Sequence, residues 1–512
     1  MTAQDARALL LKIAPRIEDH ADEIARLCGY LPLALRVAAS TITVRKDLST
    51  GEYVRRLSDE KQRLNHLKEV DAALSVSYEL LDEAEQRLWR ALAVFPNTFD
   101  HVGAAAVWEM EADLAKDVLG SLMTCSLLEY DQGVGRYSLH DLARLFTEER
   151  QRPPESVELK RRHAFHYQHL IARASALYLE GGEALKQGLA LFDLERENIE
   201  AGWAWAESLI AEDEQAAQLC LDYAGAGRYV LTLRQHPRDQ IKRAEGQLTA
   251  ARRLKNRQHE GAALGNLGIA YAMLGETIKA IEFHNEYLTF AREMGDRRAE
   301  GGALGNLGLA YKALGEAREA IEFHEQALVI HRELGYRQGE GSQLGNLGVA
   351  YAMLGESRRA IEFYETSLVI HRELGDLYGE ANDLGNLGVA YSDLGKTRKA
   401  ADFFEQCHNI HREIGDRRGE GNDLGNLGNA YAALGEQRKA IEFYEQQLTI
   451  TREIGDRRGE GNSLWSISLV LSNIGEHENA IARAEEALRI FEEIESPHAE
   501  MVRSRLPQLR QS

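Results

Sequence analysis

Proline, cysteine and long apolar runs are scarce in this sequence of 512 residues, which contains eight prolines and four cysteines. No stretch approaches the roughly 20 apolar residues of a membrane span, and the run Leu9–Leu11 is too short for a secretion signal. The cysteines have no metal-binding or redox spacing, which predicts free thiols in a reducing compartment. We therefore expect a soluble, cytoplasmic protein that does not engage a membrane. The cysteines are Cys28, Cys125, Cys220 and Cys407.

Basic charge is also in short supply. The chain has 61 Lys and Arg against 81 Asp and Glu, a formal net charge of −20. A protein that holds a phosphate backbone needs clustered basic side chains. The composition therefore predicts no direct contact with nucleic acid.

Glycine, by contrast, is plentiful at 44 residues and falls in a regular pattern. The phrase Leu-Gly-Asn-Leu-Gly recurs every 40 residues without insertion, each time followed by a Tyr and then by a Leu-Gly pair. A fixed period of this size is typical of stacked arrays, which bind partners along an extended surface. The pattern predicts a recognition protein. The five copies occupy 264–268, 304–308, 344–348, 384–388 and 424–428.

Each unit is predicted to be a helical hairpin. Leu304, Leu307 and Tyr311 recur at steps of three and four residues, which places them on one helical face. Gly315 ends this first helix, and a second amphipathic helix ends at Gly335. Such a hairpin cannot bury its apolar face alone, so contacts between neighbouring units must supply most of the stability.

This unit resembles the tetratricopeptide repeat. The motif of that family appears as Leu267-Gly268, Tyr271, Ala280 and His284, and later copies place Tyr364, Phe404 and Tyr444 at the last, aromatic position. The period of 40 exceeds the usual 34 or so and resembles the long-helix variant found in kinesin light chains and bacterial signalling ATPases. The resemblance implies a solenoid over 241–500, with a degenerate first unit, repeats from 261, 301, 341, 381 and 421, and a capping unit over 461–500.

The resemblance implies a ligand groove lined by the first helices. Positions five, nine, twelve and thirteen of a unit would face it, as with Gly345, Val349, Ala352 and Met353. This small, mostly apolar wall suits a protein or peptide ligand, as an amphipathic helix or an extended aliphatic segment, better than an acidic tail. The predicted apolar groove residues are Ile269, Leu309, Val349, Val389 and Met353.

A column of asparagines accompanies these positions. Asn side chains hold a peptide backbone through a donor and an acceptor, although each Asn could equally bond the backbone of a neighbouring repeat. Asn429 adds a polar group at a position that faces the groove. The column consists of Asn266, Asn306, Asn346, Asn386 and Asn426.

Two other recurring features predict no site. His331, His371 and His411 repeat with the unit, but equivalent positions in successive repeats lie roughly 20 Å apart if each helix is about 10 Å thick, so no metal ion is expected to join them. Residues 390–397 nearly match a phosphate-binding loop, yet they form an interhelix turn without the required preceding strand.

The first third of the chain carries two informative phrases, Gly29-Tyr30-Leu31-Pro32-Leu33 and Tyr137-Ser138-Leu139-His140-Asp141. They resemble the Gly-Leu-Pro-Leu and Met-His-Asp motifs of the NB-ARC or STAND signalling ATPases, apart from Tyr30 and Leu139. The resemblance implies that Pro32 lies near the adenine and His140 near the diphosphate of ADP. Locally, Pro32 also suits the first turn of a helix, Asp141 a helix cap, and His140 a packed strand end.

In these ATPases the phosphate loop and the magnesium-binding strand precede the first phrase by well over a hundred residues, whereas this chain begins 28 residues before Gly29. We therefore expect neither nucleotide hydrolysis nor strong nucleotide binding by this chain, and no Ser/His/Asp or Cys/His grouping indicates another enzyme activity. ADP or ATP, and oligomerisation, are expected only together with a nucleotide-binding half. The chain could be a fragment, a truncated gene product or half of a split system.

The predicted fold is mainly α-helical. It comprises a helical subdomain (1–70), a small α+β winged-helix module (71–150), a helical connector (151–240), the solenoid (241–500) and a tail (501–512). The winged-helix segment has six basic against fifteen acidic side chains, so it is not expected to bind DNA. The leading interpretation is the sensing portion of a STAND regulator. The alternatives are a scaffold without nucleotide dependence and a transcriptional regulator.

Overall fold

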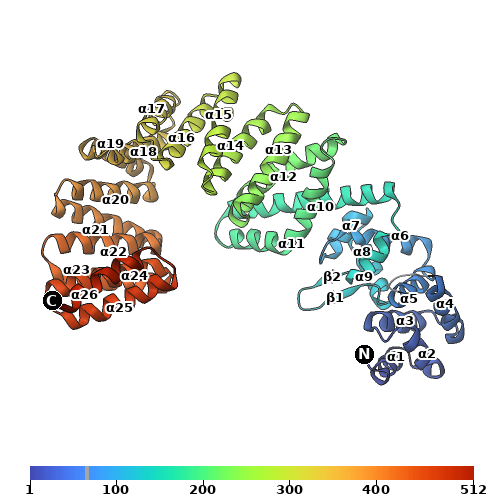
Figure 1. Cartoon of the computed structure of the whole chain (residues 1–512). Coiled ribbons are helices and arrows are strands. Elements are labelled where there is room, and N and C mark those ends of the chain that lie inside the picture. The colour runs from blue at the N-terminus through green and yellow to red at the C-terminus, as the bar shows by residue number, and fades with distance from the viewer. Residues whose placement is uncertain (64–67, 512) are drawn as a thin grey trace. The chain divides into compact units, whose positions relative to one another are not determined.

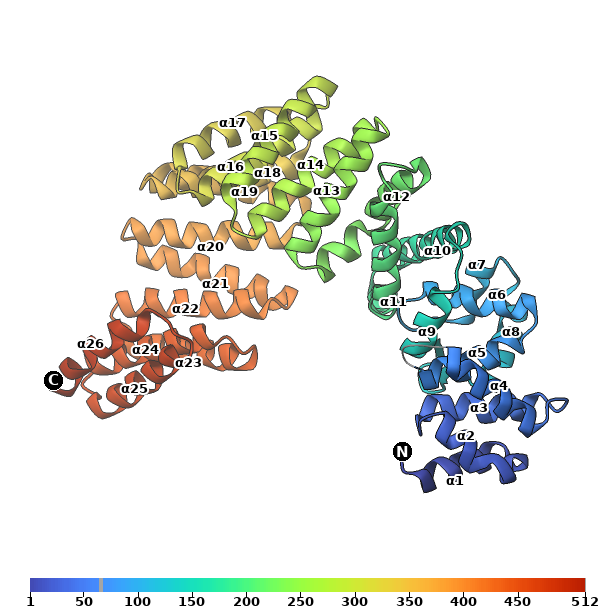
Figure 2. The same cartoon turned by 45° about the vertical axis from the view of Figure 1, so that its right-hand side comes forward.

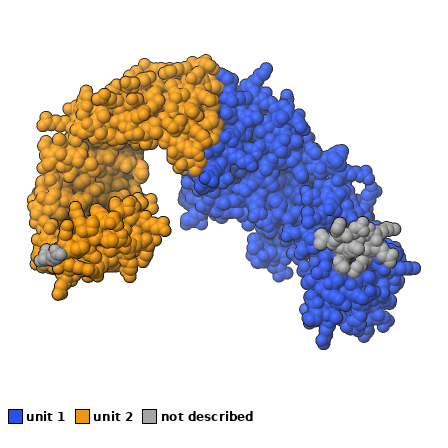
Figure 3. All heavy atoms as spheres, in the orientation of Figure 1, with its two compact units in different colours: residues 1–263 blue, residues 264–512 orange. Residues whose placement is uncertain are grey.

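The computed structural model describes residues 1–63 and 68–511 and is predominantly helical, as predicted (Figure 1). The backbone forms two compact units, Met1–Ala263 and Leu264–Ser512, which we call unit 1 and unit 2 (Figure 3). The proposed limits of the five segments stay predictions. Among the described residues, no helix is both long and apolar enough to cross a bilayer.

Unit 1 begins with short helices and continues into longer ones. Pro32 opens its helix at the first position, where a missing N–H costs nothing, as its local interpretation predicted. Its elements are α1 (Ala3–Ile13), η1 (Pro15–His20), α2 (Ala21–Leu27), α3 (Pro32–Val44), α4 (Thr50–Arg63), α5 (Lys68–Glu79), α6 (Glu83–Ala91), η2 (Leu92–Val94), α7 (His101–Trp108), α8 (Ala112–Thr124), β1 (Glu129–Asp131), β2 (Arg136–Ser138), α9 (Asp141–Glu148), α10 (Pro153–Glu180), α11 (Gly182–Ser208), α12 (Glu214–Arg234) and α13 (Pro237–Arg253).

Among the described residues, the strands form one two-stranded β-hairpin. Strands β1 and β2 pair antiparallel with Tyr130 opposite Tyr137, and Tyr137 also forms a bridge with Phe99. The hairpin follows α6, α7 and α8 and is anchored to α6, because the Trp89 indole N–H donates to the Leu127 carbonyl at 3.1 Å. The assignment of this module as a winged helix stays a prediction.

A buried ion pair fastens the hairpin to α11. The Arg136 guanidinium on β2 bonds both carboxylate oxygens of Glu195, with Nη2 donating to Oε2 at 2.7 Å. The same guanidinium donates to the hydroxyl and the carbonyl of Thr98, and Asn198 donates to that carbonyl and to Glu195. The two ionic side chains are only 5% and 4% exposed. The fold therefore supplies the buried Arg136 guanidinium with its carboxylate and its other hydrogen-bond partners.

Loss of one partner from this pair should be costly. We predict that Glu195→Gln lowers the free energy of unfolding of unit 1 by about 3–5 kcal/mol, because it leaves a buried guanidinium without its carboxylate. The matched control is Glu183→Gln on the same helix, whose exposed pair with Lys186 should contribute less than about 1 kcal/mol. Urea unfolding of the full chain measures both changes, and equal losses would contradict the role assigned to the buried pair.

Unit 2 is a stack of helical hairpins of constant length. Figures 1 and 2 show α20, α21 and α22 side by side in both views, and contacts between consecutive helices run from α15 to α26. Its helices are α14 (Arg257–Met273), which includes the limit between the units, α15 (Thr277–Met294), α16 (Arg297–Ala313), α17 (Ala317–Glu333), α18 (Arg337–Met353), α19 (Ser357–Leu374), α20 (Leu377–Asp393), α21 (Thr397–Ile414), α22 (Arg417–Ala433), α23 (Gln437–Glu453), α24 (Arg457–Asn473), α25 (His477–Glu493) and α26 (His498–Gln511).

The end of the chain differs from the prediction of a tail. Residues 501–511 belong to α26, which packs on α25. Val502, Leu506 and Leu509 are buried. Their spacing of four and three residues places them on one face of the helix, so the array continues beyond the predicted capping unit.

Within each hairpin the two helices cross at a glycine. Gly348 of α18 lies against the ring of Tyr364 of α19 so closely that a Cβ would stand 2.5 Å from the ring. The equivalent contacts pair a glycine with the predicted aromatic position or its histidine substitute. They are Gly268 with His284, Gly308 with His324, Gly388 with Phe404 and Gly428 with Tyr444.

Arginine–glutamate pairs join one hairpin to the next. Glu300 at the start of α16 accepts from Arg292 at 2.9 Å and from Arg297 at 2.6 Å, and Arg297 also pairs with Glu333 at the end of α17. The pattern recurs at Glu340 and Glu460. Glu420 pairs with Arg417, and Glu380 pairs with Arg372 in the unit where Leu377 replaces the second arginine. These exposed arginines share largely buried carboxylates, so the pairs act as networks.

The close helix crossing predicts that a Gly→Ala substitution changes the stability of unit 2 in opposite directions at two glycines. Gly348→Ala should destabilise unit 2 by about 1–3 kcal/mol, because the added Cβ overlaps the Tyr364 ring. Gly302→Ala, on the preceding first helix, should stabilise it by about 0.5–1 kcal/mol, because that glycine is exposed with nothing within 4 Å. Urea unfolding followed by circular dichroism measures both. Destabilisation by both variants to the same extent would contradict the account.

Candidate ligand groove and predicted nucleotide contacts

The exposed side of each first helix forms one aliphatic column in unit 2. Ile269, Leu309 and Val389 are 46%, 40% and 48% exposed, and Val349 in the repeat between is partly exposed. Met353, one turn further along α18, is also exposed. Because α16 contacts α18 and α18 contacts α20, the members of the column follow one another across adjacent helices. The ninth positions, together with Met353 at a thirteenth position, therefore supply accessible apolar surface, while Asp393 makes the thirteenth position of the next unit acidic.

The fifth position packs between repeats. A Cβ at Gly345 would stand 3.3 Å from a carboxylate oxygen of Asp383 and 3.4 Å from the hydroxyl of Ser367, and both of those side chains are buried. Gly385 likewise faces Cys407. Both glycines are partly exposed, so this position favours a small residue, and its place on the groove wall stays a prediction.

The asparagine column is accessible and unpaired. Asn266 is exposed and the other four members are partly exposed. In the part of the chain that the structure describes, no hydrogen bond joins any of their five side chains to another residue, so the proposed bond to a neighbouring backbone is not formed. Asn429 is different, since its carbonyl oxygen accepts from the Tyr444 hydroxyl at 2.7 Å. Asn429 is thus partly committed to its own hairpin.

A second asparagine column, which the sequence did not predict, lies on the later first helices. Asn382, Asn422 and Asn462 are exposed on α20, α22 and α24, four residues before the position of the first column. The i, i+4 spacing within each first helix was the available signal. Arg418 and Arg458 begin the same stripe and are exposed. Arg298 is exposed at the same position of α16, so basic residues lie on both early and late repeats, and the later repeats differ by their exposed asparagines.

The recurring histidines are buried between repeats and lie outside the groove. His371 Nδ1 lies 2.8 Å from a carboxylate oxygen of Asp383 on the next first helix, and His411 pairs with Asp423 at 2.6 Å in the same way. The hydrogen bond to Asp383 raises the pKa of His371 above its usual value, although burial opposes the shift. No ligand ladder joins the three histidines, because each belongs to its own interface.

The predicted nucleotide contacts lie at two helix starts in unit 1. Pro32 is exposed at the beginning of α3. Two residues before Pro32, where the family has glycine, stands Tyr30, whose φ of 57° is a conformation that favours glycine. His140 is the N-cap of α9 and its Nδ1 accepts from the Leu142 N–H at 3.3 Å, so the cap expected at Asp141 is one residue earlier. Contact of Pro32 and His140 with a nucleotide stays a prediction.

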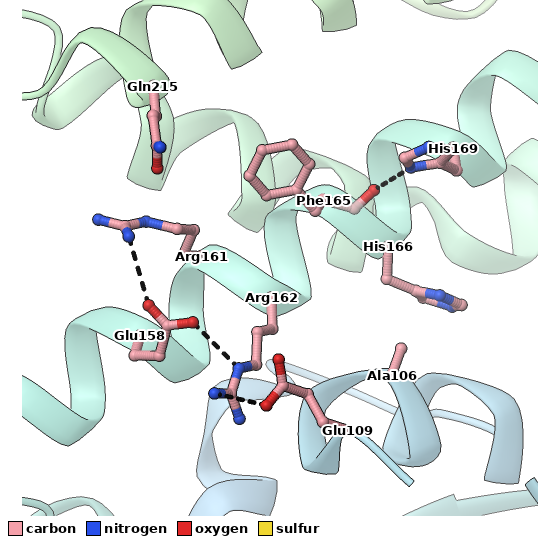
Figure 4. A pocket seen from close by; sticks show the side chains of 9 residues that line it. All are labelled: Ala106, Glu109, Glu158, Arg161, Arg162, Phe165, His166, His169 and Gln215. Carbon is pink, nitrogen blue, oxygen red and sulfur yellow. Dashed lines mark hydrogen bonds and ion pairs between the residues drawn. The ribbon is translucent and has the colours of Figure 1, made fainter. Parts of the chain in front are cut away.

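A surface pocket of about 520 Å³ lies elsewhere in unit 1, between the end of α7 and α10 (Figure 4). Arg162 pairs with Glu109 at 2.9 Å, and Arg161 pairs with Glu158 and with Asp213. Because these carboxylates already neutralise both guanidiniums, the pocket is poorly suited to a phosphate. Neither predicted nucleotide contact lines it.

Two buried histidines should make unit 2 sensitive to acid. Burial lowers the pKa of His284 and of His324 to about 4, so the folded state resists protonation that the unfolded chain accepts near pH 6.5. Each contributes about 3 kcal/mol of stability that is complete above about pH 6.5 and is lost as the pH falls toward about 4. We predict that His284→Phe with His324→Phe flattens this loss, since Phe404 occupies the same position. Urea unfolding at pH 7, 5.5 and 4.5 measures the loss of stability. Identical pH profiles for the natural chain and the double variant would refute the prediction.

Comparison with known proteins gives a family for the repeats. Residues 300–373, 344–413, 379–453 and 424–493 match the tetratricopeptide repeat model. The chain is 35% identical over 156 residues to Regulatory protein AfsR of Streptomyces coelicolor, which covers 28% of this chain and 16% of that protein. It is 31% identical over 173 residues to Regulatory protein AfsR of Streptomyces griseus, a match that covers 31% of this chain and 18% of that protein. The chain thus spans less than a fifth of the length of these two curated relatives.

A third relative is Disease resistance protein RML1A of Arabidopsis thaliana, 32% identical over 123 residues that cover 24% of this chain and 12% of that protein. Among solved structures, a STAND protein with a tetratricopeptide repeat sensor from Pyrococcus horikoshii matches 95% of this chain and 72% of its own, at 17% identity and a TM-score of 0.46. BtubC from P. vanneervenii matches 43% of this chain and 93% of its own, at 24% identity and a TM-score of 0.40.

Proposed function

Residues 300–493 are tetratricopeptide repeats, and on that premise we propose that this chain is the ligand-sensing portion of a STAND-type regulator. Its first helices bind a protein or peptide trigger, and the modules of unit 1 pass that event to a nucleotide switch. Two of the relatives are named regulatory proteins, which agrees with this class. The observation that carries the proposal is the column of unpaired asparagines beside exposed aliphatic side chains.

The ligand is an extended segment. An amide side chain offers one acceptor and two donors, which matches the C=O and N–H of a peptide backbone. Successive first helices are in contact, which places their axes about 8–10 Å apart, closer than the roughly 20 Å expected from the thickness of a helix pair. An extended chain advances about 3.3 Å per residue. One asparagine therefore meets the ligand about every third residue. A helical ligand would keep its backbone groups to itself and leave this column without partners.

The stripe also indicates which ligand side chains it favours. Aliphatic ligand side chains are favoured over Leu309, Val349 and Val389, where each contact removes apolar surface from water. Polar or acidic ones are favoured near Arg298, Arg418 and Arg458, which lie at the starts of α16, α22 and α24. The proposed trigger therefore combines an aliphatic stretch with acidic or polar side chains.

Coupling to a nucleotide rests on the motif resemblance at Pro32 and His140. ADP held by a nucleotide-binding half would favour a closed arrangement, and the trigger would favour an open one, so that binding shifts the population between the two. Within unit 1, the buried Arg136–Glu195 pair supports this role, because it ties the hairpin that leads to His140 to the helical connector.

The groove is tested with peptides selected from a displayed library of 12-residue sequences against the immobilised full chain. We predict that Val349→Asp with Val389→Asp abolishes binding of the selected peptides in fluorescence anisotropy, because each carboxylate would be desolvated by the bound ligand. The matched control is Val329→Asp with Val369→Asp, on the second helices α17 and α19, where both valines are exposed to a similar extent. The control should retain full affinity. Equal affinities for both double variants would contradict the groove.

A further inference from the structure

Three metal-binding side chains converge inside unit 2. Cys407 and His411 lie one turn apart on α21, and Asp423 lies on α22 of the next hairpin. The sulfur is 3.6 Å from His411 Nδ1, that nitrogen is 2.6 Å from an Asp423 carboxylate oxygen, and all three donor atoms lie within 4.8 Å of one another. The residues are 2%, 8% and 4% exposed, so the cluster is shielded from bulk water.

The neighbouring repeat provides an internal comparison. Ser367, His371 and Asp383 occupy the equivalent positions with closely similar distances, 3.5 Å from hydroxyl to Nδ1 and 2.8 Å from Nδ1 to carboxylate. That cluster lacks the thiol, and hydroxyls are not among the usual ligands of zinc. Cys407 is thus the change that turns a structural hydrogen-bond cluster into a set of metal ligands.

The same hairpin departs from the repeat at a second position. His408 stands where the other hairpins have a buried leucine, namely Leu288, Leu328, Leu368 and Leu448. Its Nδ1 is buried and has no hydrogen-bond partner among the described residues. Burial raises the pKa of Asp423, and His408 is close enough to oppose that shift electrostatically. An unpaired buried nitrogen in place of a core leucine needs an explanation, and a bound ion supplies one.

We propose that Cys407, His411 and Asp423 form a binding site for a zinc-class divalent cation, with His408 as the candidate fourth ligand. Thiolate, imidazole and carboxylate are the ligands that Zn²⁺ prefers, at about 2.0–2.3 Å from the ion. Two such ligands at a tetrahedral angle lie about 3.4–3.6 Å apart, and the sulfur-to-Nδ1 distance already matches. The Nδ1-to-carboxylate distance must open by about 1 Å, which rotation of the Asp423 side chain can provide.

The surroundings suit this chemistry. Nε2 of His411 lies 3.9 Å from a carboxylate oxygen of Asp416, and a metal-binding histidine commonly directs its second nitrogen to a carboxylate. The thiolate, and not the thiol, is the metal ligand, so a bound ion takes the place of the Cys407 thiol proton. The ion would join α21 to α22 and so stiffen the contact between two repeats.

The test is titration of the metal-free full chain with Co²⁺, which reports thiolate ligation by a charge-transfer band and tetrahedral geometry by its visible spectrum. We expect one thiolate-bound ion per chain, displaced by Zn²⁺. Cys407→Ser, which recreates the neighbouring cluster, should abolish the thiolate band and weaken binding more than about 100-fold, since even outer-shell partners are worth about 10–100-fold. His408→Leu, which restores the repeat, should weaken binding and alter the visible spectrum.

A transplanted site separates this proposal from adventitious binding. Ser367→Cys gives the neighbouring cluster the missing thiol and should raise the number of thiolate-bound ions from one to two per chain. Cys28, Cys125 and Cys220 remain in every variant and serve as internal controls. Absence of a thiolate band in the natural chain, or its persistence in Cys407→Ser with cooperative unfolding intact, would overturn the proposal.

Discussion

The contact between a glycine on each first helix and the ring on its second helix is the constraint on which the array depends. At Gly348 the helix backbone lies directly on the Tyr364 ring, so no side chain intervenes. This approach fixes which face of the first helix is buried. The opposite stripe, with Val349 and the asparagine column, is left exposed. The same contact thus builds the core and presents the binding surface.

Polar groups divide between two tasks. Several of those between repeats are paired, as in the Arg–Glu networks around Glu300 and in the pair of His371 with Asp383. The five asparagines of the first column have no partner in the described chain. Because buried polar groups are expensive to leave unpaired, stability explains the first set. It does not explain the second set, whose amides remain available to a ligand.

The repeat period and its phrases predicted the hairpins, the helix ends and the aliphatic column, because helical spacing alone decides which residues share a face. Other features depend on contacts between distant residues. Arg136 and Glu195 are 59 residues apart, and nothing local marks them as partners. The packing of the fifth position could not be predicted for the same reason, since Gly345 faces a side chain of the next repeat. The cluster at Cys407 could not be predicted from the sequence either, because recognising it requires both the thiol and the position of Asp423 on the adjacent helix.

The central claim is that the ligand lies along the first helices of unit 2. The most direct measurement is photocrosslinking of a selected 12-residue peptide that carries a photoreactive group, followed by mass-spectrometric mapping on the full chain. The account predicts labels on the exposed stripes of α16, α18 and α20, around Leu309, Val349 and Val389. Labels confined to the second helices α17, α19 and α21, or spread evenly over both sets, would contradict it.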